Sequence, residues 1–183
     1  LEAGDFITKY QPFTKSKRQV QYRLTDHFCR FWIAQVMGKN RSDNYWHTNH
    51  LSNSTHAWRG IAFEELCMLH VQQIKSALQI AGVASEESAW VIKGNDDKEG
   101  AQIDLIIKRS DNIVNLCEMK CYQDEYQVTK EEEMKIRSRM SAVMEHLKKR
   151  QSLNVTLVTN FGLKQGIHSG IFTNVITLDD LFR

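Results

Sequence analysis

The sequence predicts an α/β protein whose main part is a mixed sheet flanked by helices, with a small β-hairpin and helix at its N-terminus. Residues 101–120 hold two short apolar segments around a polar turn, the pattern of two buried antiparallel strands. Apolar residues recur at helical spacing before and after this hairpin, and an apolar segment at 154–160 follows the second helix. The expected order from residue 58 is therefore helix, strand, strand, strand, helix, strand, with the last strand joined by a crossover connection.

The N-terminal appendage covers residues 1–38. Two alternating stretches around the basic turn 15–18 predict a hairpin. Thr25 or Asp26 can cap the helix that follows, and Gly38 ends it. The apolar stripe of this helix comprises Phe28, Phe31, Trp32 and Val36. The basic turn fits either a contact with a DNA backbone or an ordinary solvated hairpin tip.

Residues 39–57 predict a polar linker, because they contain almost no aliphatic side chains. His47, His50 and His56 lie in this segment, and His47 and His50 have His-x-x-His spacing. No partner ligands stand at convincing spacing, so we expect solvent-exposed histidines rather than a metal site.

Residues 58–81 predict one long helix that ends at Gly82. His70 falls on its apolar side, where we expect a hydrogen-bonded histidine rather than a ligand. Glu64 and Glu65 stand near the start of the helix, where acidic residues favour the helix dipole without any further role.

The central hairpin consists of residues 102–108 and 113–120, preceded by a strand at 88–93 and a loop. Its apolar strands are interrupted by Asp104, Glu118 and Lys120. A loop of residues 110–112, with Asn112 in the left-handed conformation, places Asp104 opposite Glu118 and all three charges on one face. A two-residue loop would turn Asp104 to the other face, and we predict the three-residue loop. Gln102, Ile106 and Leu116 then share the charged face, opposite Ile103, Leu105, Cys117 and Met119.

Two carboxylates and an ammonium on a mostly buried sheet must compensate one another or bind a ligand. Both strands are apolar on both faces, which argues against a solvated surface ion pair. A divalent cation between Asp104 and Glu118 would remove their repulsion, and Mg²⁺ prefers one or two carboxylates with waters and phosphate oxygens. Lys120 would then position or help to deprotonate a water molecule aimed at a phosphodiester. The residues indicate a nuclease site.

Beyond the hairpin, residues 129–132 spell a capping box that starts a helix. Its predicted buried stripe is Ile136, Met140, Val143, Met144 and Leu147. Its basic residues are interleaved with acids, so we interpret them as a solvated face rather than a phosphate-tracking surface: Lys130, Lys135, Arg137, Arg139, Lys148, Lys149 and Arg150. Strands are predicted at 154–160 and 172–177, followed by a short helical turn.

An acid in an Ile-Asp-Leu strand, a short hairpin and then Glu-x-Lys resembles the PD-(D/E)XK nuclease superfamily, with Asp104, Glu118 and Lys120 at the motif positions. Ile103 stands where the motif name has Pro, a common variation. More narrowly, WRGIAFEELC, GAQIDLII and NLCEMK are similar to the C-terminal nuclease-like domain of prokaryotic AAA-type ATPases, which follows a winged helix. By this resemblance, residues 1–38 are the end of a winged-helix-like segment, 39–57 a linker and 58–183 the nuclease-like domain.

The resemblance implies a restriction-endonuclease-like core and catalysis by Asp104, Glu118, Lys120 and Glu64. It implies that Asp104, Glu118, Glu64 and the carbonyl of Met119 bind Mg²⁺, with Mn²⁺ as a substitute. Glu64 is preferred to Glu65 because Gly60, Phe63 and Glu64 match the family's helix motif. Gln102 is an auxiliary candidate that would hold a water or a phosphate, or else bond a neighbouring strand end.

The whole composition sets limits on partners and location. A formal charge of +2 on 183 residues means that nucleic-acid binding must come from local patches. No run of eighteen apolar residues and no signal-peptide architecture is present, so we expect a cytoplasmic protein without a membrane partner. The four cysteines form no Cys-x-x-Cys pair, which indicates reduced thiols.

The expected function is metal-dependent endonuclease or exonuclease cleavage of nucleic acid, with DNA preferred. The chain has no Gly-x-x-x-x-Gly-Lys-Ser/Thr segment, so ATP binding would belong to an N-terminal ATPase region absent from it. One alternative is a catalytically inactive nuclease-fold module that binds nucleic acid or regulates the ATPase. Another is an interaction domain in which the three charges form a buried ion network. Because a duplex has two strands to cut, a homodimer is also compatible with the resemblance.

Overall fold

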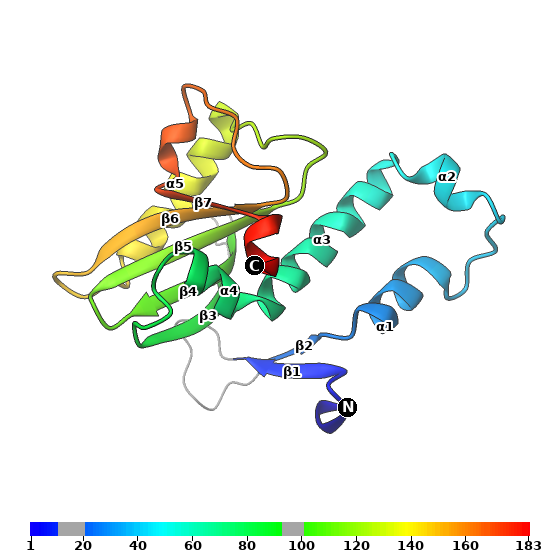
Figure 1. The fold of residues 1–183 in the computed structure, drawn as a ribbon, viewed down its shortest axis with the longest axis horizontal. Coiled ribbons are helices and arrows are strands. Elements are labelled where there is room, and N and C mark those ends of the chain that lie inside the picture. Colours follow the sequence, from blue (N-terminus) through cyan, green and yellow to red (C-terminus); the bar gives the residue numbers. More distant parts are fainter. Residues whose placement is uncertain (11–20, 93–100) are drawn as a thin grey trace.

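The structure is a computed structural model that describes residues 1–10, 21–92 and 101–183 (Figure 1). It is an α/β protein with a five-stranded mixed sheet, a separate two-stranded antiparallel sheet and flanking helices. The basic turn 15–18 and most of the loop predicted before the central hairpin lie outside the described residues.

The five-stranded sheet forms the centre of the molecule. Its strands, in spatial order, are β3 (Ser85–Ile92), β4 (Ala101–Arg109), β5 (Ile113–Lys120), β6 (Ser152–Thr159) and β7 (Asn174–Thr177). Strands β3, β4 and β5 pair antiparallel, whereas β5, β6 and β7 pair parallel. The predicted crossover from β5 to β6 is confirmed, and it runs through α5 (Lys130–Met144).

Two apolar cores lie on the two faces of this sheet. One core joins Ile106 and Leu116 to Ile136 and Val143 of α5. The other joins Leu105, Ile107, Cys117 and Met119 to α3 (Asn53–Leu69) and α4 (Val71–Ala77). Figure 1 shows α5 on one side of the sheet and the pair α3 and α4 on the other.

The predicted three-residue loop between β4 and β5 is confirmed. Asn112 has φ of 68°, the left-handed conformation that the loop requires. Leu105 pairs with Cys117 and Ile106 with Leu116, a register that, continued by one residue, brings Asp104 beside Glu118.

A β-bulge, which the sequence did not predict, lies on β4 between Ile103 and Ile106. The step from Ser88 to Trp90 on β3 pairs with the longer step from Ile106 to Ile103 on β4. The extra β4 residue breaks the alternation of faces, so Ile103 joins the α5-side core. The prediction that Ile103 lies with Leu105 on the opposite face was therefore wrong.

The prediction of one helix over 58–81 was wrong in three respects: the helix starts earlier, it is interrupted at His70, and its second part, α4, ends at Ala77 rather than at Gly82. Helix α3 begins at Asn53, inside the predicted linker, because the side chain of Ser52 accepts a hydrogen bond from the backbone N–H of Thr55. It ends at Leu69, because the backbone of His70 leaves the helical conformation, and Nδ1 of His70 lies 2.8 Å from the carbonyl oxygen of Leu66. A short helix, α2 (Tyr45–Asn49), also lies in the predicted linker. His47 and His50 are exposed as predicted, whereas His56 is half-buried.

The N-terminal appendage contains the predicted hairpin, β1 (Ile7–Tyr10) and β2 (Gln21–Leu24). Asp26 caps α1 (His27–Phe31), which continues as a π-helical turn, Trp32–Val36, and the chain turns at Gly38 with φ of 69°. Phe28 and Trp32 of the predicted apolar stripe are exposed in this chain.

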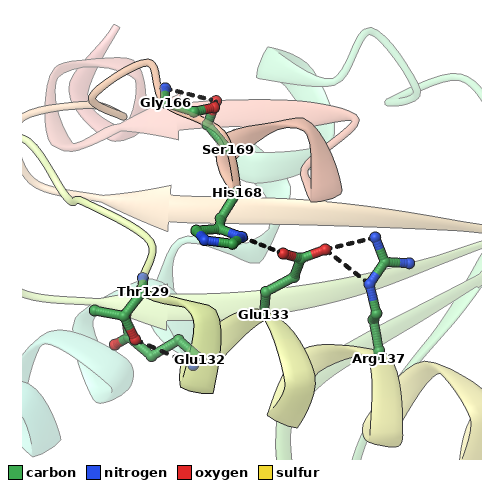
Figure 2. A network of polar contacts seen from close by, with 7 residues as sticks. All are labelled: Thr129, Glu132, Glu133, Arg137, Gly166, His168 and Ser169. Carbon is green, nitrogen blue, oxygen red and sulfur yellow. Dashed lines mark hydrogen bonds and ion pairs between the residues drawn. The ribbon is translucent and has the colours of Figure 1, made fainter.

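The elements after the hairpin follow the prediction with small shifts. Thr129 and Glu132 form the predicted capping box of α5 (Figure 2). Met144, predicted to be buried, is 52% exposed because α5 ends there. Strand β7 starts at Asn174 rather than at 172. The 3₁₀ turns are Glu2–Gly4, Ser169–Ile171 and Leu178–Phe182.

No helix in the described ranges is long and apolar enough to cross a membrane.

Candidate active site

One cavity of about 560 Å³ gathers the predicted site residues. Glu64 from α3, Gln102 and Asp104 from β4, and Glu118 and Lys120 from β5 all line it. Asp104 lies within the bulge of β4, and the backbone N–H of Met119 donates a hydrogen bond of 3.2 Å to Asp104 Oδ2. This bond ties the first acid to the strand that carries the second acid and the lysine.

Glu118 is the most enclosed charged group of the site, with a fully buried side chain. Its Oε2 accepts a hydrogen bond of 2.5 Å from Nη1 of Arg139 and lies 3.8 Å from Nζ of Lys120. Within the described residues, its Oε1 has no hydrogen-bond partner. Burying a carboxylate oxygen without a hydrogen-bond partner costs free energy. Oε1 of Glu118 can therefore accept a bond from a further donor group or a cation.

The three acids resist ionisation in this cavity. Burial, together with the nearby charge of Asp104, raises the pKa of Glu64 to about 7. Burial also raises the pKa of Asp104, against the lowering effects of the Met119 N–H and of Lys120. It raises the pKa of Glu118 against the lowering effects of Arg139 and Lys120. A cation bound here would favour the ionised forms and offset this cost.

The two neighbouring acids of α3 have different environments. Glu65 is buried, and its Oε1 pairs with Nη2 of Arg30 at 3.1 Å and Nε of Arg23 at 3.6 Å. Glu64 makes no hydrogen bond or ion pair within the part of the chain that the structure describes, and it lies close enough to Asp104 to feel its charge. Glu64 is thus the acid of this pair that remains available to the cavity.

The N-terminal appendage forms one wall of the same cavity, through Tyr22, Arg23, Leu24 and Arg30. Arg30 also donates from Nη2 to the carbonyl oxygen of Leu24, so Glu65 holds the hairpin and α1 together against α3. The sequence predicts residues 1–38 as a separate segment and contains no local signal that they pack against α3.

We expect replacement of Glu65 by alanine to loosen the appendage, because two guanidinium groups lose their buried carboxylate. The free energy of unfolding should fall by about 1–3 kcal/mol. Hydrogen exchange in β1 and β2 should become faster, while exchange in β5 should change little. The matched control is Glu86→Ala, which removes an exposed partner 4.0 Å from Lys108. Equal exchange in the two variants would contradict the anchoring role of Glu65.

Two carboxylates of the site fit a hard divalent cation such as Mg²⁺, but the third acid does not lie together with them. No three His, Cys, Asp or Glu side chains lie together as metal ligands in the described ranges, so Asp104, Glu118 and Glu64 are not gathered into a three-carboxylate set. Asp104 and the unpartnered Oε1 of Glu118 nevertheless offer the pair of carboxylates that Mg²⁺ takes together with waters and substrate oxygens. Cys67 lies near Asp104 and Glu64. Burial raises the pKa of its thiol, so the thiol stays protonated and is unsuited to metal binding.

Arg139 is the site residue that sequence reasoning missed. It was interpreted as part of the solvated face of α5, yet it lines the cavity and bonds Glu118. A signal was present, because residue 139 stands three positions after Ile136 and four before Val143, on the buried side of the helix.

Comparisons of the chain with models of protein families, with curated proteins and with solved structures find no match.

Proposed function

We propose that this chain is a metal-dependent nuclease domain that hydrolyses phosphodiester bonds of DNA. The observation that carries the proposal is the environment of Glu118. One oxygen of this buried carboxylate bonds Arg139 and the other has no partner among the described residues, beside Asp104 and Lys120 in an open cavity. A structural ion pair with both carboxylate oxygens satisfied would leave no oxygen free to accept a further ligand.

Asp104 and Glu118 would hold Mg²⁺ or Mn²⁺, with the carbonyl of Met119 as a further donor. Glu64 would have to move toward these two acids to join them as a ligand. The cation, when bound, supplies Lewis-acid chemistry and makes water a stronger nucleophile at neutral pH. Lys120 is partly exposed to the cavity and would orient or deprotonate the attacking water. Gln102 is exposed at the cavity and would hold a water or a phosphate oxygen.

The fold supports the same proposal. If α3 and α4 are counted together as the first helix, the order helix, β3, β4, β5, α5 and β6 is the order expected of a restriction-endonuclease-like core of the PD-(D/E)XK type. In this proposal the chain is the C-terminal part of an ATPase and works in the cytoplasm, where its four free cysteines stay reduced.

A second candidate follows from Arg139. Arg139 and Lys120 together can neutralise Glu118 without any metal, which favours a catalytically inactive module that binds nucleic acid or regulates the attached ATPase. Metal binding and cleavage separate the two candidates.

The test is cleavage of plasmid DNA, single-stranded DNA and RNA in Mg²⁺ or Mn²⁺, with EDTA as the blank and calorimetric titration of Mn²⁺ in parallel. The parent chain should cut DNA only with metal, and Asp104→Asn should not cut. Mn²⁺ binding without cleavage would support the inactive module. The absence of both DNA cleavage and Mn²⁺ binding in the parent chain would refute the nuclease proposal.

The raised pKa of Glu64 leads to a pH dependence of stability. Its folded pKa of about 7 lies above the ordinary value of 4.5, so the folded state holds an extra proton between these values. The free energy of unfolding should therefore fall as the pH rises through this window. Asp104 and Glu118 shift in the same direction.

Because a bound cation competes with these protons, Mn²⁺ should raise the melting temperature more at about pH 8 than at about pH 5. Glu64→Gln should flatten the metal-free dependence. Glu131→Gln, an exposed acid on α5, serves as the control. Equal stabilisation by Mn²⁺ at both pH values would contradict a metal held by these carboxylates.

A further inference from the structure

Arg139 reaches from α5 into the cavity that holds the acids. Its side chain is 21% exposed, and Nη1 donates to Oε2 of the fully buried Glu118. This is its one hydrogen bond within the described residues. A guanidinium group has five N–H donors, so Arg139 retains donors for a ligand in the cavity.

The charges of the cavity indicate what that ligand is. Without metal, Lys120 and Arg139 balance Asp104 and Glu118, and Glu65 already pairs with Arg23 and Arg30. A divalent cation on Asp104 and Glu118 takes over the neutralisation of these two carboxylates. Lys120 and Arg139 then become surplus positive charges that face the same open space. Glu64 lines that space and can balance at most one of them, so an anionic ligand is favoured there.

The two cations differ in what they can hold. Lys120 is a compact point charge, whereas the planar fork of Arg139 matches the oxygens of a phosphate group and can bond two of them at once. The Glu118 contact fixes the guanidinium group through one nitrogen and so orients the remaining donors at little entropic cost.

We propose that Arg139 binds the phosphate group at or next to the cleaved bond, with one nitrogen on Glu118 and the others on phosphate oxygens. This inference rests on the proposed nuclease function and adds a substrate-binding group to it. Arg139 therefore touches the substrate rather than serving only as the counter-ion of Glu118.

The chain supplies a matched control on the same helix. Arg137 is two positions earlier, and its side chain is 64% exposed. It also bonds a glutamate, donating from Nε to Oε1 of Glu133 at 2.8 Å, and Glu133 further contacts His168 (Figure 2). Arg137 does not line the cavity, so its removal tests the loss of one Arg–Glu pair and one positive charge on α5 without loss of a site group.

The experiment measures binding of a fluorescent single-stranded oligodeoxynucleotide in Ca²⁺, at salt concentrations from about 50 to 200 mM, and cleavage in Mg²⁺. For Arg139→Gln, the slope of log K against log salt should become shallower by about 0.7, the loss of one phosphate contact on a single strand. Its kcat should fall about a hundredfold. Arg139→Lys should keep the slope and recover part of the rate, and Arg137→Gln should change neither.

An unchanged slope in Arg139→Gln, with loss of cleavage that parallels a lower melting temperature, would overturn the inference and leave Arg139 as a support of Glu118. If the parent binds DNA without cutting it, the proposed catalysis fails, and the slopes still decide whether Arg139 contacts phosphate. If the parent neither binds nor cuts DNA or RNA, both proposals fail.

Discussion

Replacement of Glu118 by glutamine is expected to lower the rate of phosphodiester cleavage about a thousandfold, because the site loses several kcal/mol of metal-dependent stabilisation of the transition state. Glutamine keeps the size of the side chain and an oxygen that can accept the bond from Arg139. It removes the negative charge that a divalent cation requires. Mn²⁺ affinity, measured by calorimetry, should fall together with the rate.

Folding should survive this replacement. Burial already raises the pKa of Glu118, so its ionised form costs free energy in the metal-free protein, and a neutral amide avoids that cost. Thermal unfolding without metal should therefore show no large loss of stability. Full cleavage activity in Glu118→Gln would contradict a metal site at this carboxylate. A drop in the melting temperature that accounts for the lost rate would indicate a structural ion pair instead.

Replacement of Lys120 by methionine is expected to lower the cleavage rate about 10²–10⁴-fold, the usual size of a general acid–base contribution. Lys120 lies 3.8 Å from Oε2 of Glu118, at the edge of the cavity and partly exposed. Methionine keeps a similar length and removes the ammonium group. The expected defect is in kcat, measured under saturating DNA.

Metal binding distinguishes this variant from Glu118→Gln. Without the ammonium group, a cation on the carboxylates meets less repulsion, so Mn²⁺ should bind Lys120→Met at least as tightly as the parent. Lys108→Met is the matched control, since Lys108 is a half-buried lysine of β4 that pairs 4.0 Å from Glu86. Loss of Mn²⁺ binding together with cleavage in Lys120→Met would contradict its role in positioning water.

Much of the sheet could be predicted from the sequence, because its signals are local. Two short apolar segments on either side of the polar turn 110–112 favour a hairpin, and Asn112 tolerates the left-handed conformation that the loop needs. The capping box at Thr129 marked the start of α5, because this signal too lies within a few neighbouring residues. The helix boundaries at Ser52 and His70 were missed, because a run of apolar residues at helical spacing does not show a cap or a break.

The sequence alone brought Asp104, Glu118 and Lys120 into one hypothesis, since neighbouring positions on two paired strands determine which charges can share a site. Only the tertiary structure decided how those charges are balanced. The bulge between Ile103 and Ile106 depends on how β4 pairs with β3, and the bond from Arg139 to Glu118 joins residues 21 positions apart. The contact of Arg30 with Glu65 spans 35 positions. Such contacts depend on how whole elements pack, and no local pattern of residue types encodes the distance between them.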